Sequence, residues 1–450
     1  MAGSEVVARG FGWRHAGRKD PALQGLDLHI EPGERVLLLG ESGSGKSTLL
    51  AALAGVLGDV EDGERSGEIS IHPGPAGMVL QNPESQVIAS RVGDDVAFGC
   101  ENLRVPREEI WPRVQASLAA VGLTLPLNHP TAELSGGQQQ RLALAGVLAM
   151  QAGLILLDEP TANLDPQGVS EVVDAVHHAV NETGATLVVV EHRVEQWLDV
   201  ITRVIVLGDG GIVADGPKEI LDSLELPGVW LPNSPIPTFE RRQSREIFLA
   251  TEDLLTGYRE PIGGPRNVEL RKGASTVITG HNGAGKTTLL LTLSGLLRPL
   301  GGRITGFARP PYTWKSRELA RRIGYVFQDP EHQFVARTVI DELRVGPQVM
   351  GVDAEERIEE LLARLRLEHL AEANPFTLSG GQKRRLSVAT ALVAAPELLM
   401  LDEPTFGQDR RTFLELVQIL RELTQEGITL CSVSHDELFL RLLGDYEVKL

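Results

Sequence analysis

The sequence has few cysteines, few aromatic residues and no long hydrophobic run. Cys100 and Cys431 are the only cysteines among 450 residues, and neither belongs to a CxxC pair. A disulfide framework, a zinc site and an iron–sulfur cluster are therefore unsupported. We expect Cys431 to be an ordinary core residue of a buried strand over Thr429–Val433. Apolar runs such as Leu154–Leu157 are far too short to cross a bilayer, so no membrane-spanning segment is expected.

A basic balance and a secretory signal are also missing. The formal net charge of −18 argues against a general nucleic-acid-binding surface, so no nucleic acid is expected as a partner. The first five residues contain no basic flank followed by an apolar core, and we expect no signal peptide. With 42% hydrophobic residues and a mean hydropathy of −0.04, the composition predicts a globular protein that stays in the cytoplasm.

The chain does contain a complete glycine-rich phosphate loop, and it contains it twice. Gly40–Ser47 and Gly280–Thr287 both have the spacing G-x-x-x-x-G-K-[ST]. Each follows an apolar strand-like run, Arg35–Leu39 or Ser275–Thr279, and each precedes a helix-like stretch rich in leucine. Glycines allow backbone N–H groups to surround the β- and γ-phosphates, and the helix N-terminus adds a favourable dipole. The predicted nucleotide-binding residues of the two loops are Gly40, Glu41, Ser42, Gly43, Ser44, Gly45, Lys46, Ser47, Thr48, Gly280, His281, Asn282, Gly283, Ala284, Gly285, Lys286, Thr287 and Thr288.

Within these loops the lysine and the hydroxyl have distinct roles. Lys46 and Lys286 supply a positive charge to the phosphates. Ser47 and Thr287 offer a hydroxyl oxygen to Mg²⁺, whose remaining ligands are phosphate oxygens and water. The cofactors predicted from the sequence are therefore ATP and Mg²⁺.

The duplication extends beyond the loops to the whole chain. The matched positions, separated by nearly constant distances along the sequence, are Lys46 and Lys286, Gln81 and Gln328, Ser135 and Ser379, Asp158 and Asp402, and His192 and His435. This separation is far longer than the roughly 20–50 residues of a solenoid repeat, so it indicates two tandem domains. We expect domain 1 over residues 1–226, a proline-rich extended linker over 227–246, and domain 2 over 247–450.

Inside each half, strand-like runs alternate with helical patterns. This alternation predicts an α/β fold, with a mainly parallel sheet core covered by helices. Charged helical stretches at Arg107–Val121 and Ala354–Ala371 predict a helical subdomain inserted into each core. The chain is thus expected to hold two P-loop nucleotide-binding domains.

A second acidic motif ends an apolar strand in each half. Leu154–Leu157 is followed by Asp158 and Glu159, and the second copy places Asp402 and Glu403 after a similar run. An aspartate at a strand end beside a phosphate loop holds Mg²⁺, and the following glutamate can polarise a water against the γ-phosphate. We therefore predict Asp158 and Asp402 as metal ligands and the two glutamates as catalytic residues.

The sequences Leu134–Arg141 and Leu378–Arg385 resemble the signature motif of ATP-binding cassette (ABC) ATPases, and the resemblance covers both halves nearly end to end. It implies that the signature residues bind nucleotide; these are Ser135, Gly136, Gly137, Gln138, Ser379, Gly380, Gly381 and Gln382. It further assigns Q-loop glutamines that approach the metal (Gln81, Gln328), D-loop aspartates (Asp165, Asp409), catalytic switch histidines (His192, His435) and upstream rings that stack on adenine (Trp13, Tyr258).

In this family the signature of one cassette closes on the nucleotide held by the other. The resemblance therefore implies that the two cassettes pair with each other and form two composite sites. Site 1 would place Ser379 and Gly381 opposite four residues of cassette 1, namely Lys46, Asp158, Glu159 and His192. Site 2 would place Ser135 and Gly137 opposite Lys286, Asp402, Glu403 and His435. A dimer of two whole chains could give the same chemistry.

The stretches after the two Q-loops, Gln81–Gln86 and Gln328–Gln333, share the pattern QxPxxQ and resemble the energy-coupling factor (ECF) importers of vitamins and metal ions. The resemblance implies a transmembrane T-like component and a substrate-binding membrane component as partners, and a peripheral location on the cytoplasmic face of the membrane. The cargo would be a vitamin, a vitamin precursor or a metal ion.

Two alternatives stay open, and one difference separates the halves. An exporter ATPase would carry the same motifs. A soluble ribosome-associated ABC ATPase would also have two cassettes, although such proteins carry a long charged helical linker where this chain is proline-rich. A DNA-repair ABC ATPase would need zinc-binding cysteines. His192 follows Glu191, whereas His435 follows Ser434, so the two sites are expected to differ in rate.

Overall fold

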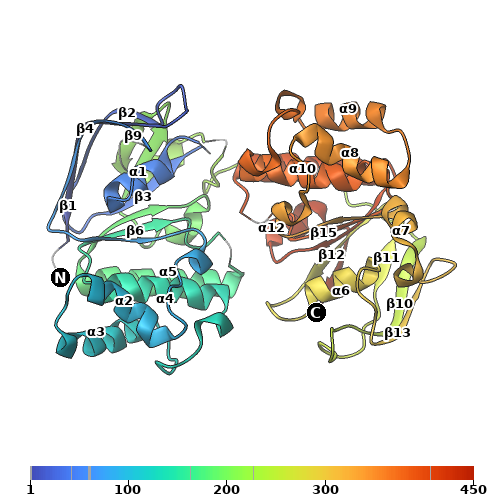
Figure 1. Cartoon of the computed structure of the whole chain (residues 1–450), viewed down its shortest axis with the longest axis horizontal. Coiled ribbons are helices and arrows are strands. Elements are labelled where there is room, and N and C mark those ends of the chain that lie inside the picture. Colours follow the sequence, from blue (N-terminus) through green and yellow to red (C-terminus); the bar gives the residue numbers. More distant parts are fainter. Residues whose placement is uncertain (1–2, 42, 59–61, 163, 227, 406) are drawn as a thin grey trace. The chain divides into compact units, whose positions relative to one another are not determined.

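The computed structural model describes residues 3–41, 43–58, 62–162, 164–226, 228–405 and 407–450. The chain forms two compact units, the first built on residues up to 235 and the second on residues 236–408 and 412–450. We call them cassette 1 and cassette 2 and describe each by itself (Figure 1). Within the described ranges, no helix combines the length and the apolar character that crossing a membrane requires.

Cassette 1 is built on a six-stranded sheet in the order β5-β6-β7-β3-β8-β9, parallel except for the last pair. Its strands are β5 (Ala76–Val79), β6 (Leu154–Asp158), β7 (Thr186–Val190), β3 (Arg35–Gly40), β8 (Arg203–Gly208) and β9 (Gly211–Pro217). A three-stranded antiparallel sheet consists of β2 (Leu23–Ile30), β1 (Glu5–His15) and β4 (Gly63–His72). Because β6, β7 and β3 are parallel neighbours, their carboxyl ends meet at one edge of the sheet.

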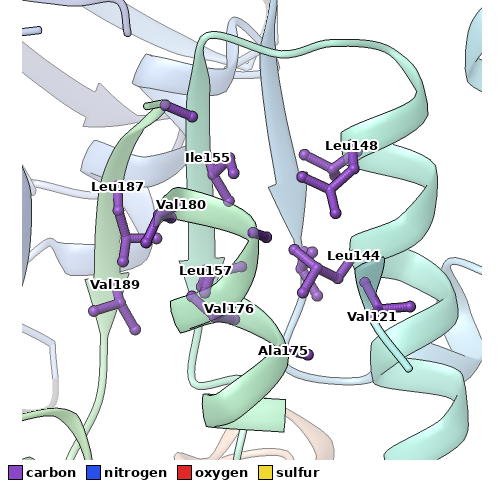
Figure 2. Close-up of a cluster of buried hydrophobic side chains, with 14 of the residues drawn as sticks. Val121, Leu144, Leu148, Ile155, Leu157, Ala175, Val176, Val180, Leu187 and Val189 are labelled. Atoms are coloured by element: carbon purple, nitrogen blue, oxygen red, sulfur yellow. The ribbon is translucent and has the colours of Figure 1, made fainter. Parts of the chain in front are cut away.

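Both faces of this sheet are buried, which explains the continuous apolar runs of its strands. On β6, Ile155 and Leu157 belong to the same core as helices α4 (Gly136–Ala149) and α5 (Pro166–Thr183), as Figure 2 shows. Leu154 and Leu156 point to the opposite core. That second core also contains leucines of α1 (Lys46–Ala54), which follows the phosphate loop. The inserted helical subdomain contains α2 (Val92–Asn102) and α3 (Arg107–Ala120).

Cassette 2 repeats this plan. Its main sheet is parallel throughout, in the order β14-β15-β16-β12-β17, beside a three-stranded antiparallel sheet β11-β10-β13. The strands are β10 (Ile247–Leu255), β11 (Glu269–Arg271), β12 (Ser275–Thr279), β13 (Gly301–Thr305), β14 (Ile323–Val326), β15 (Leu398–Asp402), β16 (Thr429–Val433) and β17 (Tyr446–Lys449). The helices are α6 (Lys286–Leu293), α7 (Ser316–Arg322), α8 (Val339–Met350), α9 (Glu355–Arg364), α10 (Gly380–Leu392), α11 (Arg410–Gln425) and α12 (Glu437–Leu443).

These elements confirm the predicted α/β class, with a parallel sheet core in each half. The predicted strand over Thr429–Val433 is β16, and Cys431 is fully buried in it. The helical stretch predicted from Ala354 to Ala371 ends earlier, because Arg366 adopts a left-handed backbone with φ of 54° and a short 3-10 turn follows. The prediction was too long because the charged pattern continues past Arg366, where the backbone leaves the helical conformation.

The stretch predicted as an extended linker contacts the cassette at each of its ends. Pro227 lies outside the described residues. Val229 is fully buried in the core of cassette 1, and the main chain of Trp230 bonds to that of His192. Toward the other end, the Arg242 N–H donates to Asp445 Oδ1 of cassette 2 at 2.8 Å.

Candidate functional site

Each phosphate loop runs between a central strand and a helix, and the matched glycines of the two loops have similar backbone conformations. Gly45 and Gly285 precede α1 and α6 with φ of 95° and 85°, in the left-handed region that L side chains rarely adopt. A Cβ on Gly45 would also lie only 2.6 Å from the carbonyl oxygen of Ala22. Such a backbone turns consecutive N–H groups toward one concavity, which suits a phosphate. Ser42, predicted as part of the first loop, lies outside the described residues.

Both loop lysines extend into the curve of their own loop. Lys46 Nζ donates to the carbonyl oxygens of Gly40 and Glu41, each at 2.8 Å. Lys286 Nζ donates in the same way to Gly280 at 2.9 Å and to His281 at 3.1 Å. Burial lowers the pKa of the Lys46 ammonium, although nearby carboxylates oppose the shift. An ammonium held this way can exchange loop carbonyls for phosphate oxygens without a large movement.

The predicted metal ligands lie together in each cassette. Thr287 Oγ1 donates to Asp402 Oδ1 at 3.1 Å, and the Ser47 hydroxyl bonds to Asp158. Burial raises the pKa of Asp158, and it raises the pKa of Asp402 to about 6. Hydroxyl and carboxylate oxygens are the ligands that Mg²⁺ prefers, and a poorly hydrated carboxylate gains most from a divalent cation. These residues therefore fit a magnesium ion.

The two Q-loop glutamines are placed differently. Gln81 Nε2 donates to Glu159 Oε2 at 2.7 Å, so its side chain lies against the predicted catalytic carboxylate. Gln328 is exposed, and its main-chain carbonyl accepts a hydrogen bond from the Arg384 guanidinium at 2.6 Å. Direct metal coordination by either glutamine remains a prediction.

Both predicted catalytic glutamates adopt a strained backbone. Glu159 has φ of 47° and Glu403 has φ of 43°, although neither is a glycine. In each case the N–H donates to the end of the neighbouring strand, to Val190 O or Val433 O at 3.0 Å. Such strain costs about 1–3 kcal/mol and persists only where the surroundings impose it, as they often do at functional sites. No sequence pattern indicated this conformation.

Each glutamate pairs with the predicted switch histidine of its own cassette, but through different ring nitrogens. His192 Nε2 lies 2.9 Å from Glu159 Oε1, whereas His435 Nδ1 lies 3.0 Å from Glu403 Oε1. Burial by itself lowers the pKa of both imidazoles, and the adjacent glutamate outweighs it, so the pKa of each histidine is raised. The pairs can hold a proton next to a carboxylate, as activation of a water requires.

The signature residues begin a helix in each cassette. Ser135 and Ser379 are the N-caps of α4 and α10, and each forms a capping box with the glutamine three residues later. Both serines are exposed. The exposed helix N-terminus, with a hydroxyl beside it, can stabilise an anion. The first turns contain the predicted glycines Gly136, Gly137, Gly380 and Gly381.

The ring predicted to stack on adenine in cassette 1 is buried in this structure. Trp13 is only 4% exposed, and its ring lies so close to Gly63 that a Cβ there would stand 2.6 Å from the indole. Its Nε1–H donates to His15 Nδ1 at 3.2 Å, and His15 Nε2 lies 3.2 Å from Thr48 Oγ1. His15 is an exposed ring beside the start of α1 that the sequence analysis did not single out, and adenine stacking by Trp13 stays a prediction. In cassette 2 the predicted ring, Tyr258, is 68% exposed.

A buried arginine was also missed. Arg384 in α10 is 2% exposed, and its guanidinium donates to Phe327 O at 2.7 Å and Gln328 O at 2.6 Å. Burial lowers its pKa to about 10. In cassette 1 the equivalent position is Gln140, which makes 3.4 Å contacts to Leu80 and Gln81 carbonyls. In the fold, Arg384 fixes the Q-loop backbone of cassette 2 through these two hydrogen bonds.

Comparisons with known proteins agree with this geometry. The family model described as "ABC transporter" matches residues 23–162 and again residues 265–406. A protein of Bacillus subtilis (strain 168), provisionally named the HMP/thiamine import ATP-binding protein YkoD, is 37% identical over 471 residues, which cover 95% of this chain and 85% of YkoD. A provisionally named ABC transporter ATP-binding protein of Methanosarcina acetivorans is 35% identical over 496 residues, covering 94% and 80%.

Solved structures resemble the whole chain as well. The archaeal ribosome recycling factor aABCE1, solved with the ribosomal stalk protein aP1, superposes with a TM-score of 0.65 at 21% identity, covering 98% of this chain and 87% of that one. An RNase-L inhibitor gives the same TM-score and identity. At this identity the likeness concerns the fold alone, and it confirms two tandem domains of this architecture.

Proposed function

Since this chain belongs to the ABC transporter family of ATP-binding proteins and is an ATP-hydrolysing enzyme, we propose that it is the energy-coupling subunit of an ECF-type importer. The observation that carries the proposal is the 37% identity, over 95% of the chain, to a protein named for HMP/thiamine import. A vitamin or vitamin precursor is the proposed cargo, with a metal ion as the alternative. The composite ATP sites expected from the sequence are part of this proposal.

The segment after each Q-loop supports a membrane partner. In cassette 1, Gln86 Oε1 accepts from the Leu80 N–H at 2.7 Å and its Nε2 donates to Met78 O at 3.0 Å. In cassette 2, Gln333 Oε1 accepts from the Phe327 N–H at 3.1 Å. The last glutamine of each QxPxxQ segment thus connects that segment to the main chain just before the Q-loop glutamine. A partner that displaces the segment would therefore also displace the Q-loop of the ATP site.

The loop that follows carries an exposed apolar residue in both cassettes. Asp95 Oδ1 accepts from the N–H groups of Ile88 and Ala89 at 2.7 and 2.8 Å. Glu342 Oε2 accepts from the N–H groups of Val335 and Ala336 at 2.8 and 2.7 Å, and it lies nine residues past Gln333, as Asp95 lies nine residues past Gln86. Ile88 is 63% exposed and Val335 is 74% exposed. One exposed apolar side chain is unremarkable by itself, but its presence at matched positions of both cassettes, in loops held by the same hydrogen bonds, supports a common protein contact.

The proposed partners are a transmembrane T-like component and a substrate-binding membrane component, with the chain peripheral on the cytoplasmic face of the membrane. To test this, the tagged chain is expressed in its native cells, membranes are extracted with mild detergent, and co-purifying proteins are identified. We expect a polytopic protein together with a small membrane protein. Recovery of ribosomes without a membrane protein would overturn the proposal, and recovery of an exporter subunit would assign the opposite direction of transport.

A substitution pair sharpens this test. Ile88→Asp combined with Val335→Asp is expected to abolish recovery of the membrane proteins, while ATP hydrolysis by the purified chain is retained. Val213→Asp is the matched control, because Val213 is 61% exposed but lies on strand β9 rather than in either loop. Recovery that is unaffected by the double substitution contradicts the role of these loops.

A further inference from the structure

Glu191 is a buried carboxylate that the motifs of the site do not explain. It directly follows strand β7 and is 3% exposed. Among the described residues, no lysine or arginine pairs with it, and burial raises the pKa of its carboxyl. Burying a carboxyl group away from cations costs free energy unless its oxygens are hydrogen-bonded. Its two hydrogen bonds therefore indicate what the residue does.

Glu191 bridges the two chain segments that carry the predicted catalytic pair. Its Oε2 accepts from Thr161 Oγ1 at 2.5 Å, and its Oε1 accepts from the N–H of His192 at 2.9 Å. Thr161 lies two residues after Glu159, on the segment that leaves β6. Since β6 and β7 are adjacent parallel strands, with Asp158 opposite Val190, the Glu191 side chain joins their carboxyl ends.

This bridge bears directly on the histidine. With its N–H held by Glu191, the main chain of His192 has little freedom, and its ring presents Nε2 to Glu159 Oε1 at 2.9 Å. The anchor at Thr161 is on the same short segment as Glu159, so both partners of the catalytic pair are positioned against one carboxyl group. A displacement of about 1 Å at such a site can cost up to about 100-fold in rate.

Cassette 2 provides an internal comparison. Ser434 occupies the position before His435 and is 1% exposed, but its shorter side chain accepts from the N–H of Asp436 at 3.1 Å. That contact stays within its own turn rather than reaching the segment after Glu403. His435 approaches Glu403 through Nδ1, not through Nε2. The two cassettes thus position their histidines by different means.

We propose that Glu191 is a positioning residue of the first ATP site, where it connects Thr161 to the main chain of His192 and holds the imidazole Nε2 toward Glu159 during hydrolysis. The proposal rests on the assignment of Glu159 and His192 to the ATP site. It acts through hydrogen bonds rather than through charge. A neutral carboxyl or a carboxamide can form both contacts, since each has one acceptor oxygen for the N–H and one donor for the threonine hydroxyl.

The test uses the purified full chain and steady-state ATP turnover. Glu191→Ser, which introduces the residue of cassette 2, is expected to lower the kcat of site 1 about tenfold or more, with KM for ATP and the affinity for a fluorescent ATP analogue within about twofold. Glu191→Gln is expected to keep at least about half of the wild-type kcat, because the amide oxygen can still accept from the His192 N–H and the amide N–H can donate to Thr161 Oγ1, with the direction of that bond reversed.

Each variant is measured in the wild-type and the Glu403→Gln backgrounds. If Glu403→Gln alone retains turnover, that turnover belongs to site 1 and reports the effect directly. If Glu403→Gln abolishes turnover, the sites are obligately coupled, and the wild-type background reports the full effect. The proposal is therefore tested in either case.

Two further variants separate positioning from folding. Thr161→Val removes the hydroxyl anchor at almost unchanged volume, and we expect a loss in kcat that is not additive with Glu191→Ser. Ser434→Ala is the matched control in cassette 2 and is expected to change kcat by less than about twofold. If Glu191→Ser lowers the melting temperature, its loss of kcat could come from unfolding. The kcat values of Thr161→Val and Glu191→Gln then decide whether Glu191 positions the histidine.

Three results would overturn the proposal: an unchanged kcat in Glu191→Ser, a Glu191→Gln variant as impaired as Glu191→Ser, or a change in KM alone. Failure of the underlying site assignment looks different. In that case the double variant Glu159→Gln, Glu403→Gln would continue to hydrolyse ATP.

Discussion

The main-chain N–H of Trp230 donates a hydrogen bond to the carbonyl oxygen of His192 at 2.8 Å. The N–H of Val194 donates back to the Trp230 carbonyl at 3.3 Å, so a short parallel bridge joins the stretch around Trp230, near the boundary of cassette 1 at residue 235, to the segment of the switch histidine. Val229 beside it is fully buried. We therefore expect a displacement of the histidine segment to move the main chain around Trp230 as well.

Hydrogen exchange can detect this connection. We expect Mg²⁺ and a non-hydrolysable ATP analogue to slow amide exchange in residues 192–198 and in residues 228–234 together, because the two segments share main-chain hydrogen bonds. Residues 247–255 of β10 serve as the reference segment. Protection confined to residues 192–198 contradicts the expected coupling.

Removal of the predicted catalytic carboxylates is expected to stop turnover. Glu159→Gln together with Glu403→Gln should lower ATP hydrolysis at least about 100-fold while nucleotide binding persists, since loss of a general base typically costs that much. Turnover and equilibrium binding of a fluorescent ATP analogue are measured on the same preparation. Full hydrolysis by the double variant would mean that other groups activate the water.

The left-handed backbone of Glu403 makes an unusual stability prediction. Glu403→Ala and Glu403→Gly both delete the side chain, but alanine at φ of 43° retains the steric strain that glycine does not have. We expect Glu403→Gly to be more stable than Glu403→Ala by about 1 kcal/mol, the reverse of the order at a helical position. Denaturant unfolding of the nucleotide-free chain measures the difference. Equal stability, or a more stable alanine variant, contradicts the strain.

Asp402 should make the stability of the metal-free protein depend on pH. Its pKa in the folded chain is about 6, above the ordinary value of 3.8, because burial disfavours the charge. The folded state therefore binds this proton more tightly than the unfolded state, and the contribution of the group to stability rises as pH falls from above 6 toward 4. At pH 7.5 the ionised carboxylate costs up to about 3 kcal/mol.

Calorimetry in EDTA checks this expectation. Asp402→Asn should raise the melting temperature of cassette 2 at pH 7.5, and the advantage over the wild type should shrink by pH 5. Thr287→Val, which removes a hydrogen bond to Asp402 but keeps the carboxylate, is the control and should not flatten the pH dependence. An advantage that stays constant from pH 7.5 to pH 5 contradicts the raised pKa.

Much of this site could be predicted from the sequence because its chemistry is written in short local motifs. A phosphate loop needs glycine and lysine at set spacings, and strand β6 is recognisable as an apolar run followed by Asp158 and Glu159. The near-constant separation of matched residues was enough to predict two α/β domains, which the structure and the family comparison confirm.

Other features depend on distances between segments far apart in the chain, which no local pattern contains. The sequence showed that Glu191 precedes His192, but only the adjacency of β6 and β7 brings its carboxyl group to Thr161. Trp13 was predicted as a nucleotide-stacking ring, yet packing over Gly63 buries it and leaves His15 beside Thr48. The sequence by itself determined which groups the site contains, because bonding chemistry dictates residue type. Their orientation was decided only by tertiary packing, because it depends on how neighbouring strand ends meet.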